Sequence, residues 1–165
     1  MRITSSEEYG LRLAVQLAAS FPAPLTLAEL AEREGIPQPL VAKVLAKLRR
    51  AGVVRARRGR VGGYELTGEP RHISLDRVLG ALGQPLFYQG FCHQHGGKQE
   101  FCVHTQECSV RPLFFHLDRM FREFFAGTNL ADLLAEERAL DRKLASTAPL
   151  RLPLRPSEPS REERV

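Results

Sequence analysis

The residues best suited to chemistry lie in one short segment, "GFCHQHGGKQEFCVHTQECSV", residues 90–110. It holds all three cysteines of the chain and three of its five histidines. Glycines and polar side chains surround the thiols, which is typical of an exposed loop and not of a hydrophobic core. Thiolates bind zinc and iron–sulfur clusters, and accessible thiols carry redox chemistry. The sequence therefore predicts a zinc, cluster or thiol site in this loop.

The three thiols, Cys92, Cys102 and Cys108, need a fourth ligand to complete a tetrahedral zinc site or a cluster. The candidates are His93, His95, His104 and Glu107, or a side chain from elsewhere in the chain. Zinc sites favour tight Cys-x-x-Cys pairs, and the sequence has none. Spacing alone leaves zinc, a cluster and redox thiols open.

Composition is typical of a soluble globular protein, with 43% hydrophobic and 26% charged residues in 165. A chain of this length can bury a hydrophobic core as one domain. No apolar run approaches the roughly 18 residues of a membrane span, and the N-terminus lacks the apolar stretch of a signal peptide. We expect a cytoplasmic protein, in which clustered cysteines favour metal binding or redox chemistry over a disulfide.

Positive charge is concentrated in one part of the chain, whose formal net charge is +5. Between Gly35 and Tyr64 there is no Asp or Glu, while eight Lys and Arg side chains occur there. A basic run is often only a solvated surface. Its meaning therefore depends on the elements that carry it.

Capping boxes open the first two predicted helices. Thr4 and Glu7 precede the apolar run 9–19, and Thr26 and Glu29 precede a shorter helix that Gly35 ends. A Thr followed three residues later by Glu satisfies free backbone amides at a helix start, so both boundaries are well marked.

A third helix and a hairpin follow. Pro39 suits the first turn of a helix, Gly52 closes it, and apolar residues recur between them at helical spacing. These are Leu40, Val41, Val44, Leu45 and Leu48. Next, "VVRA" and "YEL" have strand character and flank "RRGRVGG", whose glycines fit a hairpin turn. The predicted fold is mainly α with a small β-hairpin wing, a winged helix-turn-helix.

In this architecture the third helix enters the DNA major groove and the wing lies along the backbone or a minor groove. Lys43, Lys47 and Arg50 fall at i, i+4 and i+7, and thirty residues without an acid offer phosphates an unbroken positive potential. We therefore predict double-stranded DNA as a partner, with Gln38 and Lys43 as base contacts. The full set of expected DNA contacts is Gln38, Lys43, Lys47, Arg50, Arg57, Arg58 and Arg60. Of these, Lys47 and the wing arginines are expected on phosphates or in the minor groove.

Ser74 is expected to cap a helix that ends at "GQP", before the cysteine segment. After that segment, residues 111–125 predict a helix with large apolar residues on one side, Leu113, Leu117, Met120, Phe121, Phe124 and Phe125. Such a stripe needs a partner, either the first helix or a second chain. Because helix-turn-helix proteins commonly read two half-sites, we expect a two-fold homodimer built on this helix.

Thr128 is expected to cap a last helix that reaches Leu144, and the Pro- and Ser-rich end of the chain to be disordered. The expected regions are a DNA-binding region 1–70, a connecting helix and cysteine-rich loop 71–110, a dimerisation helix and C-terminal helix 111–145, and a disordered tail 146–165.

Four features in order carry a resemblance: "MRIT", "GIPQPLVAKVLAKLRRAGVV", the wing "RGRVGGYEL" and three cysteines after the next helix. Together they resemble the Rrf-type (Rrf two) family of bacterial winged helix-turn-helix transcription regulators, from Met1 to about Glu137. The resemblance implies a regulator, expected to be a repressor, with a long dimerisation helix. It also implies an iron–sulfur cluster, 4Fe-4S or 2Fe-2S, that sets DNA affinity in response to nitric oxide, redox stress or iron–sulfur status.

By this resemblance, Cys92, Cys102 and Cys108 are the cluster ligands. In the nitric-oxide-sensing branch an acidic residue on the first helix of the other subunit completes the site, and Glu8 occupies that position. Glu8 could instead be an ordinary carboxylate favoured by the helix dipole. Two features depart from the family: the gap of nine residues between Cys92 and Cys102, and Arg111, which stands where the iron–sulfur assembly branch has a histidine ligand.

Two alternatives differ in class. A regulator of the same fold could use its cysteines as redox thiols or as a zinc site, without a cluster. An enzyme would need a second set of catalytic groups, and the sequence has no H-E-x-x-H, G-x-S-x-G or phosphate loop. We therefore expect no enzymatic activity.

Overall fold

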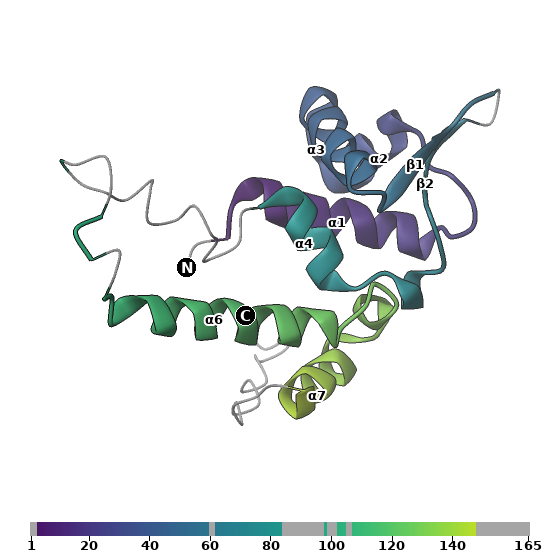
Figure 1. The fold of residues 1–165 in the computed structure, drawn as a ribbon. Coiled ribbons are helices and arrows are strands. Elements are labelled where there is room, and N and C mark those ends of the chain that lie inside the picture. Colours follow the sequence, from purple (N-terminus) through teal and green to yellow (C-terminus); the bar gives the residue numbers. More distant parts are fainter. Residues whose placement is uncertain (1–2, 60–61, 84–97, 99–101, 105–106, 148–165) are drawn as a thin grey trace, which may run out of the picture.

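The computed structural model describes residues 3–59, 62–83, 98, 102–104 and 107–147. In these ranges the chain is mainly helical with one antiparallel hairpin, which confirms the predicted winged helix-turn-helix (Figure 1). Its elements in order are α1 Ser5–Ala19, α2 Leu27–Glu34, α3 Gln38–Arg50, β1 Val54–Arg57, β2 Gly63–Leu66, the 3-10 turn η1 Pro70–His72, α4 Leu75–Leu82, α6 Val110–Ala126, the 3-10 turn η2 Asp132–Leu134 and α7 Glu137–Thr147.

Both predicted capping boxes form. The Thr4 hydroxyl accepts from the Glu7 amide at 3.3 Å, and the Glu7 carboxylate accepts from the Thr4 amide at 2.7 Å. At α2, the Thr26 amide donates to the Glu29 carboxylate at 2.7 Å, and this backbone hydrogen bond lowers the pKa of Glu29. Gly35 then ends α2 in the left-handed conformation, with φ of 64°, which glycine adopts without strain.

Helices α1, α2, α3 and α4 enclose the hydrophobic core. The inward side of α3, predicted from helical spacing, is buried as Val41, Val44, Leu45 and Leu48. It meets buried leucines of the other helices, namely Leu13, Leu17, Leu30 and Leu82. Burying one such leucine side chain contributes about 1.5–3 kcal/mol. The core therefore fixes which side of α3 points outward.

The wing is a two-stranded hairpin attached to the helices by its base. Val54 pairs with Leu66, and both side chains are buried. A bridge between Leu25 and Tyr64 holds β2 against the segment before α2. A Cβ on Gly63 would lie 2.5 Å from the Leu25 carbonyl oxygen, so this close approach requires glycine. Figure 1 shows the wing projecting away from α6.

The C-terminal end of α6 packs on α4, and the N-terminal half of α6 extends beyond the other helices (Figure 1). Arg122 of α6 lies 4.0 Å from Asp76 of α4 and forms an ion pair with it. No residue of α6 is buried, and Val110, Leu113 and Phe115 are more than half exposed. Of the apolar stripe predicted for this helix, only Leu113 is exposed, and the other five residues are half-buried in the single chain.

The prediction that Thr128 caps a helix reaching Leu144 is wrong. The backbone at 128–130 instead pairs with the start of α4: the Leu75 amide donates to the Thr128 carbonyl, and the Leu130 amide donates to the Ile73 carbonyl. The side chains of Asn129 and Asp132 then accept from each other's backbone amides at the start of the short turn η2. The last helix, α7, begins only at Glu137 and includes two residues of the predicted tail.

Asp132 also receives a contact from α7. Burial raises the pKa of this carboxyl, but hydrogen bonds from Lys143 and Asn129 outweigh it and lower the pKa overall. The remaining tail, 148–165, lies outside the described residues, as do Arg60 and Cys92. Among the described residues no helix is both long and apolar enough to cross a membrane.

Candidate nucleic-acid interface and cysteine site

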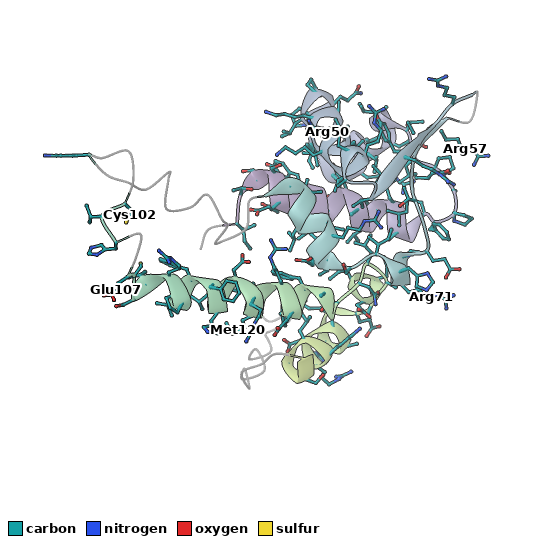
Figure 2. The ribbon with its side chains drawn as sticks, in the orientation of Figure 1. Arg50, Arg57, Arg71, Cys102, Glu107 and Met120 are labelled. Carbon is teal, nitrogen blue, oxygen red and sulfur yellow. The ribbon has the colours of Figure 1, made fainter. Side chains whose placement is uncertain are left out.

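The outward side of α3 carries the predicted DNA-reading residues. Gln38 is the first residue of the helix, and its side chain and that of Lys43 are exposed. Arg50, at the C-terminal end of the same helix, is exposed as well (Figure 2). No acidic residue occurs in α3. This helix can therefore present amide and ammonium donors to base edges and phosphates.

The wing is less positive than its sequence suggests. Arg57 and Arg58 are exposed as predicted, but Glu65 pairs with Arg55 at 2.7 Å and with Arg57 at 3.7 Å. Glu65 lies one residue beyond the acid-free run, and hairpin register places it opposite Arg55. The alternation of a hairpin could have predicted this cross-strand pair. Arg60 falls outside the described residues.

Lys47 differs from the other predicted contacts because its ammonium faces inward. Its Nζ donates to the Ser6 hydroxyl of α1 and to the Leu82 carbonyl of α4, both at 3.1 Å. Lys43, one turn earlier, is exposed. Of the three residues predicted to form a basic stripe on α3, Lys43 and Arg50 are exposed, whereas Lys47 is held between helices.

Glu8 lies on the first turns of α1 with its side chain 58% exposed. Its carboxylate is 3.6 Å from Arg12, whose guanidinium makes shorter bonds to Glu34: 2.6 Å to the carboxylate and 2.7 Å to the carbonyl. Gln16 donates to the second Glu34 oxygen at 2.6 Å. The hydrogen bond to Glu34 raises the pKa of Arg12. The spacing of Glu8, Arg12 and Glu34 in the sequence did not predict these bonds between α1 and α2.

Two of the three cysteines are described. Cys102 and Cys108 are free thiols, each half-buried, and both precede α6 in the sequence. Figure 2 labels Cys102 in the stretch before that helix. Arg111, in the first turn of α6, donates to the His104 carbonyl at 3.5 Å. This hydrogen bond connects residues 102–104 to α6, the helix that follows Cys108.

The other candidate ligands of the cysteine site lie only partly within the described residues. Cys92, His93 and His95 lie outside the described residues, whereas His104 and Glu107 are described and exposed. Among the described residues, no three His, Cys, Asp or Glu side chains gather into a metal-binding group. Two uncrosslinked thiols nevertheless match the donor type that iron and zinc prefer.

Comparison with known proteins identifies the chain as a transcriptional regulator. The Rrf2 family model, described as an iron-dependent transcriptional regulator, matches residues 3–136. The chain is also 34% identical over 140 residues to slr0846, an HTH-type transcriptional regulator of Synechocystis sp.. That match covers 84% of this chain and 91% of the relative.

Two solved structures share the fold. T. potens IscR aligns with a TM-score of 0.63 and 26% identity, over 81% of this chain and 86% of that chain. CymR of B. subtilis, described as the global cysteine regulator, aligns with a TM-score of 0.63 and 25% identity, over 81% and 95% of the two chains.

These relatives are transcriptional regulators, and a winged helix-turn-helix with basic residues on the exposed side of α3 is consistent with that function. The protein is a DNA-binding transcription regulator and not an enzyme, as expected from the sequence. By a family match that spans most of its length, the chain belongs to the Rrf2 family of transcriptional regulators and is related to IscR and CymR.

Proposed function

We propose that this regulator is a cytoplasmic homodimeric repressor whose affinity for its operator is set by an iron–sulfur cluster. The signal is nitric oxide, redox stress or iron–sulfur status. One observation carries the proposal: two free thiols, Cys102 and Cys108, precede α6, a helix on which Val110 and Leu113 are more than half exposed, in a family described as iron-dependent. A change at the thiols would thus act on the proposed dimer contact.

The DNA interface in this proposal is the outward side of α3 together with the wing. Gln38 and Lys43 contact bases, because they lie in the half of the helix that enters a major groove. Arg50 and the wing residues Arg57, Arg58 and Arg60 contact phosphates or the minor groove. Lys47 belonged to this set by sequence, but its two internal acceptors favour a different role, argued below.

The proposed cluster ligands are Cys92, Cys102 and Cys108, with Glu8 of the partner subunit in fourth place. The Glu8 carboxylate is exposed, and its 3.6 Å pair with Arg12 is a surface pair worth about 0–1 kcal/mol. Leaving that pair for a metal would cost little, since Arg12 keeps its shorter bonds to Glu34. A bound cluster would supply an iron atom with one exchangeable carboxylate ligand. Small oxidants would displace that carboxylate more easily than a thiolate.

The dimer contact is proposed on α6. Val110 and Leu113 lie one turn apart on the same side of the helix and are 51% and 58% exposed, and Phe115, on another side, is 54% exposed. Large apolar residues gathered on one exposed side mark an interaction surface. A two-fold axis there would set the spacing of the two recognition helices, which must match half-sites about one DNA turn apart.

The deciding experiment is the visible spectrum of protein purified without oxygen, with iron and acid-labile sulfide counted per chain. We expect charge-transfer absorption with matched iron and sulfide, and its loss on titration with nitric oxide. A colourless protein that cannot be reconstituted would contradict the cluster. The similarity to CymR, a cysteine regulator, favours the second candidate in that case: the same DNA-binding fold with redox thiols or zinc.

A further inference from the structure

Helices α3 and α4 each carry a basic side chain that donates to a carbonyl at the C-terminal end of the other helix. Lys47 of α3 donates to the carbonyl of Leu82, the last residue of α4, at 3.1 Å. Arg77 of α4 donates to the carbonyl of Gly52, just after α3, at 2.7 Å. The last carbonyls of a helix lack intrahelical partners and carry partial negative charge. Because α4 has no basic residue in its own last turn, Lys47 supplies the cation from the neighbouring helix.

The same ammonium reaches a third helix. Lys47 also donates at 3.1 Å to Ser6, in the first turn of α1. Around this contact the backbones approach closely: a Cβ on Gly10 would overlap the Leu82 side chain, and one on Gly83 would overlap the Glu7 carboxylate. The first turns of α1, the last turn of α4 and the second half of α3 therefore interlock at Lys47.

Both acceptors of Lys47 adjoin parts of the proposed sensor. In the sequence, the stretch that leads to the cysteine segment begins at the end of α4, and Cys92 follows Leu82 by ten residues. Ser6 lies two residues before Glu8, the proposed fourth ligand. A hydrogen bond requires about 2.7–3.2 Å between donor and acceptor. A displacement of either acceptor by about 1 Å consequently strains this contact, which favours a matching shift of α3 or of the Lys47 side chain.

We propose that Lys47 is a positioning residue that couples the cysteine segment and the start of α1 to the DNA-reading helix, and not a DNA contact. The inference rests on the proposed cluster-controlled function. An ammonium has three donors, and two of them already have protein acceptors. A phosphate contact would have to compete with both, whereas the exposed Lys43 faces no such competition.

The test compares Lys47→Met with Lys43→Met, two variants of one helix with the same loss of charge. Operator affinity is measured against salt concentration for cluster-loaded and cluster-free protein. Lys43→Met removes a proposed base contact, so it should weaken operator binding, relax the preference for the operator sequence and keep the wild-type ratio between the two forms. Lys47→Met should keep the slope and move that ratio toward one by about three- to thirtyfold.

Two further variants separate coupling from misfolding. Lys47→Arg keeps a cationic donor and should restore most of the ratio. Ser6→Ala removes one acceptor without changing charge and should reduce the ratio with an unchanged slope. Thermal unfolding of cluster-free protein gives a readout that needs no cluster: Lys47→Met should lower the Tm and Lys43→Met should leave it unchanged.

The outcomes distinguish this inference from the proposed function. A lower slope with an unchanged ratio in Lys47→Met would make Lys47 a phosphate contact and overturn the coupling alone. An unchanged Tm would overturn the contact between the three helices. If wild-type protein binds its operator equally well with and without the cluster, cluster control itself fails and the coupling fails with it.

Discussion

At the scale of single residues, acceptors within the protein decide what each basic side chain can do. Lys43 and Lys47 carry the same charge one helical turn apart, yet only Lys47 has its ammonium on two internal oxygens. Arg55 and Arg12 are likewise held by carboxylates, those of Glu65 and Glu34. Counting charges along the chain therefore overstates the potential that reaches DNA.

A substitution at Glu8 tests the proposed fourth ligand. Glu8→Ala should change the cluster spectrum and speed its loss on exposure to nitric oxide, because a ligand to iron is removed. Fold stability should change by less than about 1 kcal/mol, since Glu8 makes only a surface pair with Arg12. Spectra and thermal unfolding of the variant measure both effects.

Glu107→Ala is the matched control, as it removes an exposed carboxylate close to Cys108 in the sequence. It should leave the spectrum unchanged. A spectral change in Glu107→Ala but not in Glu8→Ala would transfer the ligand role to Glu107.

At the scale of elements, local signals predicted boundaries well and failed where distant segments pair. The capping boxes at Thr4 and Thr26 formed because each involves residues within one turn. Thr128 did not open a helix, because its carbonyl accepts from Leu75, far away in the sequence. The contacts of Lys47 and Arg12 were missed for the same reason: the partners belong to other helices, and spacing within one helix says nothing about them.

The base of the wing gives a prediction about stability. Gly63→Ala should destabilise the fold by about 1–3 kcal/mol, because the new Cβ meets the Leu25 backbone, which cannot rotate away. Gly68→Ala is the control, since nothing lies within 4 Å of its Cβ position. Urea unfolding of both variants measures the difference. Equal stability would mean that β2 and residue 25 separate without cost.

At the scale of the whole molecule, the chain combines a closed helical core with a long helix that the core covers only at one end. The core follows from the sequence, because helical spacing identifies its inward residues. The proposed cysteine site does not, because a ligand shared between two chains would depend on how those chains meet. Sequence reasoning therefore predicted the exposed side of α3 more completely than the surroundings of the cysteines.

The apolar side of α6 gives a prediction about assembly. Leu113→Glu should convert dimer to monomer, because it places a charge in the proposed interface, and operator affinity should fall as two half-sites are no longer bound together. Helix content should stay the same, since Leu113 is 58% exposed within one chain. Sedimentation velocity and circular dichroism check both points.

Leu134→Glu, at an exposed leucine of η2, is the control and should remain dimeric. A Leu113→Glu variant that sediments like the wild type would place the two-fold contact elsewhere.

The bridge between Ser74 and Asn129 brings together two positions that are 55 apart in the sequence. The part of the chain between them holds α4, the cysteine segment and α6, and this bridge fixes its two ends next to each other. The entropy of closing a loop depends only logarithmically on its length, so a few extra residues between α4 and α6 would cost about 0.1 kcal/mol. The nine-residue gap between Cys92 and Cys102 is therefore a change that the fold tolerates, and ligand spacing could vary among such chains while the DNA-reading surface stays intact.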